Sequence, residues 1–339
     1  MIGIRADANE IIATGHIMRC IAIAQQLEKQ GQEVAFITSD YYATSLLAKK
    51  GFQAICLNSD WKEKDQEVEE LIQCIKDNRI DKLIIDSYQV TYNYLQILKK
   101  YTKIIYIDDL YQFEYPVDML INYTIQIDET QYGYLDEKVI KLLGSSYVPL
   151  REEFQNRKIH NGKRVTNILF TTGGSDLFQI MPHLIKAVMN QSVFSSINFH
   201  VIVGAFFTNK EELVELAHEN HNILLYENVD NIAKVMEKCD LAVSAGGTTL
   251  AELSSMAIPT ISFAIADNQL AGVGAFTEEA GMPSVGDIRQ DIEQGVNNIL
   301  EWLHKLINNL ELREFIGQRE VACIDGLGAT RIAEEINRL

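Results

Sequence analysis

Histidine and glycine stand together in the segment Ala13-Thr14-Gly15-His16, between the first predicted strand and the first predicted helix. Histidine is the side chain whose titration range best suits a general base near neutral pH. Gly15 would let the backbone turn tightly and approach a ligand. We therefore predict that His16 takes a proton from a bound hydroxyl or water, with Asp7 or Asn9 orienting its ring. The alternative is that His16 caps or packs beneath the loop.

Paired glycines follow a second predicted strand, in Thr171-Thr172-Gly173-Gly174-Ser175-Asp176. Successive backbone N–H groups at Gly173 and Gly174 could form an anion-binding nest. A short turn with Asp176 as a helix N-cap is the alternative, because aspartate is a preferred N-cap residue.

A third segment, Gly246-Gly247-Thr248-Thr249-Leu250-Ala251-Glu252, again follows an apolar run and opens a predicted helix. Its two glycines would admit a pyrophosphate, and its two threonines would add hydroxyl donors. Glu252 lies one turn further and could accept both ribose hydroxyls, as the acidic residue of dinucleotide sites does. The alternative is an ordinary glycine turn with a surface glutamate. The context after a strand favours a nucleotide site.

Amide and acidic side chains end further predicted strands. Asn268 and Gln269 could hydrogen-bond a sugar or a diphosphate, unless Asn268 merely caps the next helix. Asp86-Ser87-Tyr88 and Asp108-Asp109 close two strands of the first half. The acidic pair could coordinate a metal, but no third ligand stands at a suitable spacing. We therefore expect neither a metal nor another cofactor.

Short β-branched runs alternate with amphipathic ones along the whole chain, which is typical of parallel doubly wound sheets. The predicted strands are residues 2–5, 34–38, 54–57, 82–86, 103–107, 167–171, 199–203, 223–226, 241–244 and 260–263. The rhythm breaks between about residues 148 and 165. We expect an α/β protein of two facing doubly wound, Rossmann-like domains with the ligand in the cleft between them. The expected ranges are 1–155, 156–320, and a C-terminal helix over 321–339 that packs back on the first domain.

The amino-acid composition restricts the classes of partner that the protein could bind. The formal net charge is -17, which disfavours nucleic acid and anionic membrane surfaces as partners. No apolar run approaches membrane-spanning length. The five cysteines are widely spaced and form no metal-binding pattern, so we interpret them as small buried side chains of a cytoplasmic protein. The sequence gives no indication of an oligomeric state.

Together the motifs resemble those of the UDP-sugar hydrolases of pseudaminic acid biosynthesis, which act on UDP-2,4-diacetamido-2,4,6-trideoxy-β-L-altropyranose. Arg5-Ala6-Asp7 and Gly15-His16-Ile17-Met18-Arg19-Cys20 look like the family's signature. The later glycine and Asn-Gln motifs are broader and also resemble spore-coat polysaccharide glycosyltransferases. Wider relatives are GT-B enzymes such as the peptidoglycan N-acetylglucosaminyltransferase. Ala251 departs from the pattern, because an aromatic residue often precedes the glutamate.

The resemblance implies metal-independent hydrolysis at the anomeric carbon with inversion, releasing UDP. The histidine matching His16 would activate water, the glutamate matching Glu252 would hold ribose, and the asparagine matching Asn268 would lie near the reacting centre. We thus expect His16 and Asn268 to be catalytic. The expected substrate-binding residues are Arg5, Asp7, Gly15, Tyr88, Gly173, Gly174, Ser175, Gly246, Gly247, Thr248, Thr249, Glu252 and Gln269.

Two other functions remain open from the residues. In an inverting glycosyltransferase, the same base would deprotonate a sugar hydroxyl instead of water. A regulatory protein that only binds a nucleotide-sugar would need the same grip on UDP but no base.

Overall fold

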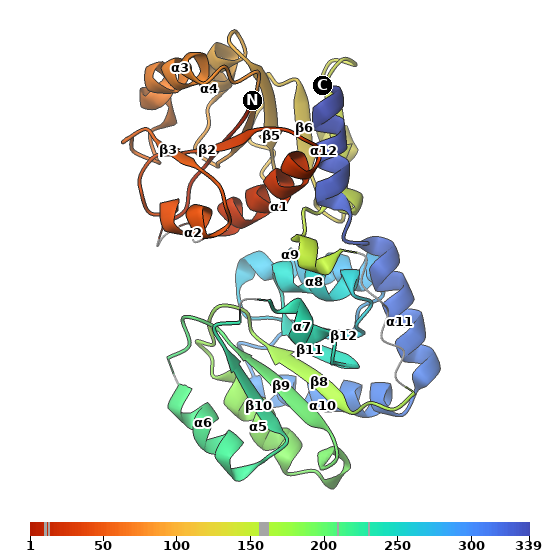
Figure 1. Cartoon of the computed structure of the whole chain (residues 1–339). Helices are drawn as coiled ribbons and strands as arrows, with labels where there is room; N and C mark the ends of the chain where they lie inside the picture. Colours follow the sequence, from red (N-terminus) through yellow and green to blue (C-terminus); the bar gives the residue numbers. More distant parts are fainter. Residues whose placement is uncertain (10–11, 13, 156–162, 209, 230) are drawn as a thin grey trace. The chain divides into compact units, whose positions relative to one another are not determined.

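The computed structural model describes residues 1–9, 12, 14–155, 163–208, 210–229 and 231–339. The chain forms two compact units, shown in Figure 1. Unit 1 comprises Met1–Glu152 and Leu327–Leu339, and unit 2 comprises Glu153–Gly326. Ala13 of the first motif and residues 156–162 of the expected linker lie outside the described residues. Each unit has its own sheet and its own core.

Unit 1 is built on a seven-stranded parallel sheet in the order β3-β2-β1-β4-β5-β6-β7. Its strands are β1 (Ile2–Ala6), β2 (Val34–Thr38), β3 (Ala54–Cys56), β4 (Lys82–Asp86), β5 (Lys103–Ile107), β6 (Met119–Asn122) and β7 (Ile140–Leu143). Its helices are α1 (Gly15–Lys29), α2 (Thr44–Lys49), α3 (Val68–Asp77), α4 (Tyr92–Leu98) and α12 (Gly328–Arg338).

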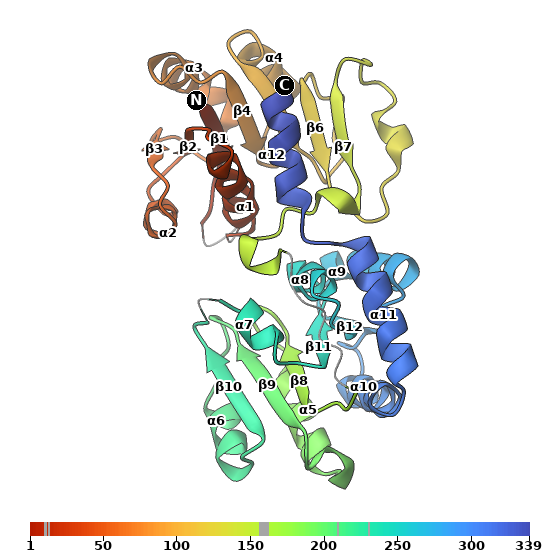
Figure 2. The ribbon, with the colours of Figure 1, turned by 45° about the vertical axis from the view of Figure 1, so that its right-hand side comes forward.

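The two faces of this sheet have separate cores, because side chains alternate along each strand. Ile84 packs with α1, α2 and α12 on one face. Its neighbours Leu83 and Ile85 pack with α3 and α4 on the other face. Figure 2 shows α1 and α12 lying side by side on the near face of the sheet. The central strands are therefore covered on both sides, as their continuous apolar sequences require.

The C-terminal helix α12 belongs to unit 1 although it follows unit 2 in the chain. It packs against α1, and Lys82 Nζ donates to the carbonyl oxygen of Ile336 at 2.7 Å. Its first residue, Gly328, lies so close to the segment before β8 that a Cβ atom would come within 2.2 Å of the carbonyl oxygen of Val148. Only glycine allows this approach without a backbone shift.

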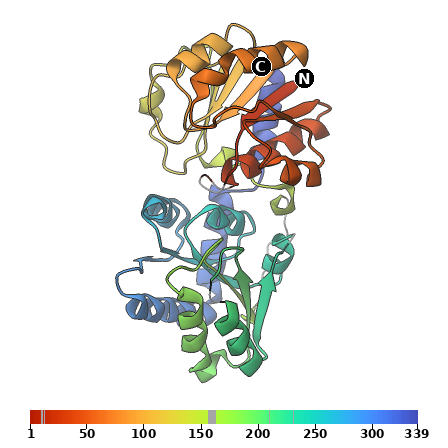
Figure 3. The ribbon, with the colours of Figure 1, turned by 90° about the vertical axis from the view of Figure 1, so that its left-hand side faces the viewer.

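Unit 2 has a six-stranded parallel sheet in the order β10-β9-β8-β11-β12-β13. Its strands are β8 (Asn167–Thr171), β9 (Asn198–Val203), β10 (Ile223–Glu227), β11 (Leu241–Ala245), β12 (Thr260–Ala264) and β13 (Ser284–Asp287). Its helices are α5 (Ile180–Met189), α6 (Lys210–Glu219), α7 (Ala233–Met236), α8 (Thr248–Ser255), α9 (Asp267–Ala275), α10 (Ile292–Ile307) and α11 (Leu310–Cys323). One face packs on α5, α6 and α10, and Figure 3 gives a second view of these layers.

Both sheets reverse their strand order at one point. In unit 1 the reversal lies between β1 and β4, where Ala6 pairs with Asp86. In unit 2 it lies between β8 and β11, where Thr171 pairs with Ser244. Ligands of doubly wound sheets bind outside the carboxyl ends of the strands at such a point. The predicted doubly wound α/β fold is confirmed in each unit.

Three strands were missed by the sequence pattern. β6, β7 and β13 each have four residues and lie at or next to a sheet edge. β3 is shorter still and was predicted, so length alone does not explain why these three strands were missed. In the described part of the chain, no helix is long and apolar enough to span a bilayer.

The close approach of Gly328 predicts a loss of stability when a methyl group is added there. We expect Gly328→Ala to lower the free energy of unfolding of unit 1 by about 1–3 kcal/mol, because rigid backbone atoms would have to move. The two tryptophans are Trp61 in unit 1 and Trp302 in unit 2. Urea unfolding followed by Trp61 fluorescence, in a Trp302→Phe background, reports unit 1 alone.

Gly15→Ala is the matched control, because Gly15 is likewise the first residue of a helix of unit 1. Apart from Gly15 itself, its chain neighbours and the backbone of its own helix, no atom of the described residues lies within 4 Å of the position that its Cβ would take. We expect this variant to unfold at about the wild-type urea concentration. Equal losses in the two variants would show that the packing of α12 does not depend on Gly328.

Candidate functional site

His16 lies in the first turn of α1, at the point where the sheet of unit 1 reverses its order. Its Nδ1 atom is 2.6 Å from Oδ1 of Asp86, the last residue of β4. The His16 side chain keeps a tenth of its surface exposed, whereas that of Asp86 is fully buried. The orienting partner is therefore Asp86 rather than Asp7, whose carboxylate is engaged elsewhere. His16 thus contacts a carboxylate at the carboxyl end of a central strand, and a carboxylate in such a position can orient an imidazole.

Arg19 holds the other side of the Asp86 carboxylate. Its Nε donates to Oδ2 and its Nη2 to Oδ1, both at 2.5 Å. Burial alone would raise the pKa of Asp86, but the Arg19 guanidinium outweighs it, and the pKa lies well below its usual range. Asp86 is therefore ionised at neutral pH. Arg19 also donates to the hydroxyl of Tyr123 and reaches Oδ2 of Asp109 at 3.3 Å.

Tyr88 forms a wall beside the imidazole. The two rings meet edge to face, with centroids 4.7 Å apart, and the Tyr88 hydroxyl donates to Oδ2 of Asp109 at 2.9 Å. Burial and the Asp109 carboxylate both raise the pKa of Tyr88, so its hydroxyl stays protonated and remains a donor. Tyr88 was predicted to bind substrate, and the structure places its ring against His16.

The predicted acidic pair Asp108-Asp109 is divided between two tasks. Asp108 is buried and accepts hydrogen bonds from the hydroxyls of Tyr115 and Tyr132, which makes it structural. Asp109 takes part in the cluster around Arg19. Among the described residues, no group of three or more histidine, cysteine, aspartate or glutamate side chains could hold a metal ion.

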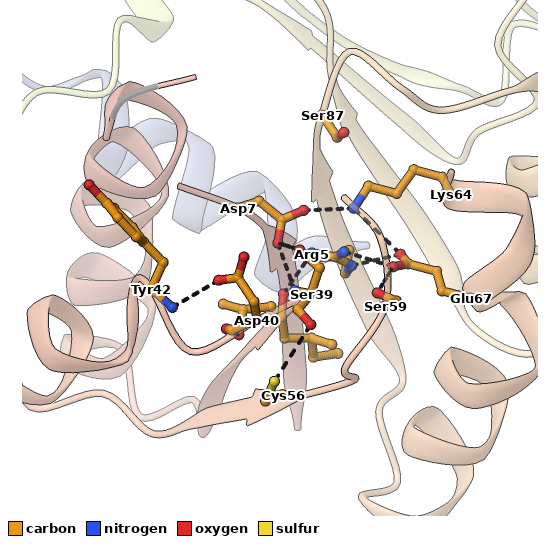
Figure 4. Close-up of polar contacts among 12 residues, drawn as sticks. Arg5, Asp7, Ser39, Asp40, Tyr42, Cys56, Ser59, Lys64, Glu67 and Ser87 are labelled. Carbon is orange, nitrogen blue, oxygen red and sulfur yellow. Dashed lines mark hydrogen bonds and ion pairs between the residues drawn. The ribbon is translucent and has the colours of Figure 1, made fainter. Parts of the chain in front are cut away.

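Arg5 and Asp7 of the first motif lie in a buried network, shown in Figure 4. Arg5 donates to both carboxylate oxygens of Glu67, from Nε and Nη2, each at 2.8 Å. Its Nη1 donates to Asp7 Oδ1, also at 2.8 Å. Lys64 Nζ lies 2.6 Å from Asp7 Oδ2. The backbone N–H and the hydroxyl of Ser39 also donate to Asp7 Oδ1, each at 2.7 Å. The four charged side chains therefore neutralise one another.

The prediction that Arg5 and Asp7 bind the substrate stays a prediction, but this network already occupies both charged groups. The Arg5 side chain has no exposed surface, and that of Asp7 only 6%. Although burial opposes ionisation of Asp7, the charges of Arg5 and Lys64 lower its pKa below the usual range. Burial also opposes ionisation of Glu67, but its bonds to Arg5 lower the pKa. Arg5 and Asp7 therefore fix the end of β1, from which the His16 loop departs.

The paired-glycine loop after β8 has two well-defined anchors. Gly173 adopts a φ of 82°, and its N–H donates to the Thr171 hydroxyl at 3.0 Å, so one donor of the predicted nest is already used. Asp176 accepts from the backbone N–H groups of Ile180 and Met181, each at 2.9 Å, and so closes the first turn of α5. Gly174 is exposed and Ser175 half-buried, so both remain accessible to a ligand.

A residue that the sequence analysis missed holds this loop in place. A Cβ atom at Gly204, just after β9, would lie 2.4 Å from the carbonyl oxygens of Gly173 and Gly174. The N–H of Phe206 also donates to the carbonyl of Gly174 at 3.0 Å. A glycine directly after an apolar strand was the available signal.

The loop after β11 opens a helix whose first turn is uncapped. Gly247 has a φ of 144°, which requires glycine, and Gly247 and Thr248 are exposed. No side chain caps α8, and its first turn contains no acidic residue. The helix dipole and its first N–H groups therefore favour an anion at this end. Glu252 lies one turn further along α8, as predicted, and is half-buried, whereas Thr249 is half-buried in the first turn.

Helix α9 packs directly on this loop. A Cβ atom at Gly246 would lie 2.9 Å from Cβ of Gln269, so only glycine admits α9 here. Gln269 Oε1 accepts the backbone N–H of Ile265 at 2.8 Å, which fixes its side chain beside the loop. Asn268 is exposed in the first turn of α9, whose N-cap is Ala266. The alternative that Asn268 is the helix cap is therefore wrong.

The structure thus gathers the predicted residues into two groups, one in each unit. His16, Gly15 and Tyr88 lie near the carboxyl ends of β1 and β4 in unit 1. Gly15 adopts no positive φ, and the space that its Cβ would occupy is open. Both paired-glycine loops follow the carboxyl ends of β8 and β11, the two central strands of unit 2. Sequence reasoning missed the roles of Arg19 and Asp86. Arg19 stands three residues after His16, which places both on one helix face and was a usable signal.

The glycosyltransferase family 28 C-terminal domain matches residues 168–270 of this chain. This range begins in β8 and ends in the first turns of α9. It therefore includes both paired-glycine loops, Glu252 and the Asn-Gln pair.

Curated relatives confirm the resemblance inferred from the motifs. The UDP-2,4-diacetamido-2,4,6-trideoxy-beta-L-altropyranose hydrolase of Campylobacter jejuni is 27% identical over 71% of this chain and 83% of its own length. The Bacillus subtilis spore coat polysaccharide biosynthesis protein SpsG is 22% identical over 98% of this chain and 96% of its own. An uncharacterised Methanocaldococcus jannaschii protein is 25% identical over 77% of this chain, which spans only 54% of that longer protein.

Solved structures share the fold at low sequence identity. MurG of Acinetobacter baumannii superposes with a TM-score of 0.70 over 100% of this chain and 99% of its own, at 12% identity. The UDP-GlcNAc 2-epimerase of Neisseria meningitidis, bound to UDP-GlcNAc, gives a TM-score of 0.68 over 100% of both chains, at 13% identity. The GT-B fold that the motifs predicted is thereby confirmed.

The buried network predicts an acid-sensitive unit 1. A carboxyl whose pKa is lower in the folded than in the unfolded chain stabilises the fold while it is ionised. Glu67 and Asp7 both have lowered pKa values, so their contribution is present above about pH 4 and is lost as the pH falls below that value. We expect Glu67→Gln to cost about 3–5 kcal/mol at pH 7, because Arg5 would lose its partner in a buried site.

Unfolding of unit 1, followed through Trp61 between pH 3 and pH 7, tests this expectation. The variant should lose less stability than wild type on acidification, because one of the titrating groups is gone. Glu70→Gln, on the exposed side of α3, removes the same charge and should change stability by no more than about 0.5 kcal/mol. Parallel pH curves for wild type and Glu67→Gln would contradict the role given to Glu67.

Proposed function

We propose that this protein hydrolyses a UDP-linked diacetamido-trideoxyhexose at the anomeric C–O bond, with inversion, in nonulosonic (pseudaminic) acid biosynthesis. The observation that carries the proposal is the contact of His16 with buried, ionised Asp86 at the switch point of unit 1. The name of the Campylobacter jejuni relative supports the substrate class. The match of unit 2 to a glycosyltransferase domain supports the nucleotide.

Unit 2 supplies the nucleotide site in this proposal. The uncapped N-terminus of α8 and the exposed Gly247 would receive the diphosphate, because backbone N–H groups and the helix dipole stabilise negative charge. Glu252 would accept the ribose hydroxyls. Asn268, exposed in the first turn of α9, would hydrogen-bond the sugar or the phosphate nearest the bond that breaks.

Unit 1 supplies the base. His16 would take one proton from a water molecule as the water oxygen bonds to the anomeric carbon. The bond from that carbon to the phosphate oxygen breaks at the same time, and UDP leaves with the electron pair. A single displacement from the opposite face inverts the anomeric configuration. Charge builds on the diphosphate in this step, so donors at α8 would stabilise the transition state more than the substrate.

An inverting glycosyltransferase is the second candidate. It is favoured by the similarity to a spore coat polysaccharide biosynthesis protein over 98% of this chain. The same His16 would then deprotonate an acceptor hydroxyl, and the nucleotide site would be unchanged. The two candidates differ only in what occupies the position of the water.

A time course of the purified protein with UDP-sugars, followed by ³¹P and ¹H NMR without an acceptor, tests the reaction. We expect release of UDP and a free reducing sugar whose first-formed anomer is inverted. His16→Gln should lower kcat by about 10²- to 10⁴-fold, because the general base is removed. His183→Gln, at an exposed position of unit 2, is the control and should keep the wild-type rate.

Turnover that appears only when a sugar acceptor is added would establish the glycosyltransferase instead. UDP release by His16→Gln at the wild-type rate would refute the assignment of the base. Tight UDP binding with no turnover across the substrate panel would indicate a nucleotide-sugar-binding protein.

The role of Glu252 is tested by calorimetric titration with UDP and 2′-deoxy-UDP. A charged hydrogen bond contributes about 1.5–3 kcal/mol, so we expect Glu252→Gln to weaken UDP binding by roughly 10- to 100-fold. The variant should discriminate less between the two ligands, because the contact to the 2′-hydroxyl is weakened. Glu301→Gln, exposed on α10, controls for the lost charge. An unchanged preference for UDP over 2′-deoxy-UDP would exclude Glu252 from the ribose site.

A further inference from the structure

We propose that Asp86 and Arg19 are positioning residues that hold His16 in the tautomer with its hydrogen on Nδ1, so that Nε2 is the atom that accepts the proton. The identity of the tautomer follows from the contacts of unit 1 by themselves. Its catalytic consequence rests on the function proposed above.

Of the two atoms that meet between His16 and Asp86, only one can donate the hydrogen. The 2.6 Å separation of Nδ1 and Oδ1 is a hydrogen-bond distance, so one of the two atoms must carry the hydrogen. Asp86 accepts two donors from Arg19 and has a pKa well below the usual range, so it is a carboxylate that can only accept. The hydrogen therefore belongs to Nδ1.

The competing arrangement involves Arg19. Its Nη2 atom lies 3.0 Å from His16 Nδ1, so an unprotonated Nδ1 could in principle accept a hydrogen bond from the guanidinium. That arrangement would set the Nδ1 lone pair against a carboxylate oxygen 2.6 Å away, which is repulsive. Because Nη2 already donates to Asp86 Oδ1 at 2.5 Å, Arg19 loses nothing when Nδ1 carries its own hydrogen.

Neighbouring side chains also prevent the His16 ring from rotating. Arg19 reaches Asp86 through two nitrogens, so the carboxylate is held in one plane as well as at one distance. Tyr88 covers the imidazole edge to face, and its hydroxyl is fixed to Asp109. Arg19 is itself tied to Asp109 and Tyr123. A ring flip would break the bond to Asp86 and disturb this packing.

Among the residues that the structure describes, the charged and titratable groups of the cluster around His16 come from several neighbouring elements. They are Arg19 and Cys20 on α1, Asp86 at the end of β4, Tyr88 after it, Asp109 after β5 and Tyr123 after β6. Burial raises the pKa values of Cys20, Tyr88 and Tyr123, so these three stay neutral. The fixed charges are then those of Arg19, Asp86 and Asp109, and the one in contact with Nδ1 that can accept its hydrogen is Asp86.

The tautomer can be measured without any activity. The measurement is a two-bond ¹H–¹⁵N correlation spectrum of the whole protein labelled with ¹⁵N-histidine. The His16 signals are those that are missing from the spectrum of the His16→Gln variant. We expect a pyrrole-type Nδ1 resonance and a pyridine-type Nε2 resonance in spectra recorded at a pH at which the imidazole is neutral. The reverse pattern, with hydrogen on Nε2, would overturn the proposal.

Two variants test the residues behind this pattern. In Asp86→Asn the side chain can place an NH2 group against Nδ1, so we expect the Nε2–H tautomer to appear and kcat to fall by at least about 10²-fold with KM little changed. Arg19→Lys keeps the charge but loses the planar fork, so we expect the wild-type tautomer with kcat lowered by roughly 10-fold. Asp40→Asn makes the same chemical change as the first variant at an exposed position and should alter neither quantity.

The outcomes separate this inference from the proposed function. A wild-type protein that releases no UDP but shows the Nδ1–H tautomer would refute the hydrolase and leave the positioning intact. A wild-type protein that hydrolyses the substrate, with Asp86→Asn folded and unchanged in both tautomer and kcat, would refute the positioning alone. The wild-type spectrum decides the tautomer even if Asp86→Asn does not fold.

Discussion

A buried carboxylate at the end of a central strand is the constraint on which unit 1 depends. Asp86 ends β4 with no exposed side-chain surface, where an unpaired charge would cost several kcal/mol. Arg19 removes most of that cost by donating hydrogen bonds to both oxygens of the carboxylate. Asp109 and Tyr123 in turn hold the Arg19 guanidinium in place. The helix that carries Arg19 therefore also carries His16 to the carboxylate. One neutralised charge sets the position of the whole group.

The same solution is used a second time at the end of β1. Arg5, Lys64, Asp7 and Glu67 are all buried and sum to zero charge. This network ties β1 to the segment before α3, far along the chain, while the Asp86 cluster ties α1 to β4. Asp7 and His16, the two residues that flank the intervening loop, are therefore each held by buried contacts with charged side chains. If His16 is the base, as proposed, such anchoring would hold it in the geometry that the reaction needs.

The sequence predicts the sheets well and the pairings poorly. Ten apolar runs were sufficient to predict two doubly wound sheets, because a strand covered on both faces must be apolar throughout. The roles of Arg5 and Asp86 could not be predicted in the same way. Arg5 looked like a substrate ligand because its motif resembles a family signature, yet its partner Glu67 lies 62 residues away and carries no pattern of its own. Long-range ion pairs leave no periodicity, and only the folded chain reveals which charges meet.

The two units place different chemistry at equivalent positions of their sheets. In unit 1 the switch point bears side chains, among them His16 and its carboxylate partner Asp86. In unit 2 it bears backbone, with Gly246 pressed against α9 and Gly247 in a conformation that only glycine adopts readily. Amide donors there are rigid and need no ionisation, which suits a diphosphate whose charge grows as its bond breaks. Under the proposed function, unit 1 would accept the proton and unit 2 would stabilise the charge on the diphosphate, so the type of reaction would depend on what His16 deprotonates.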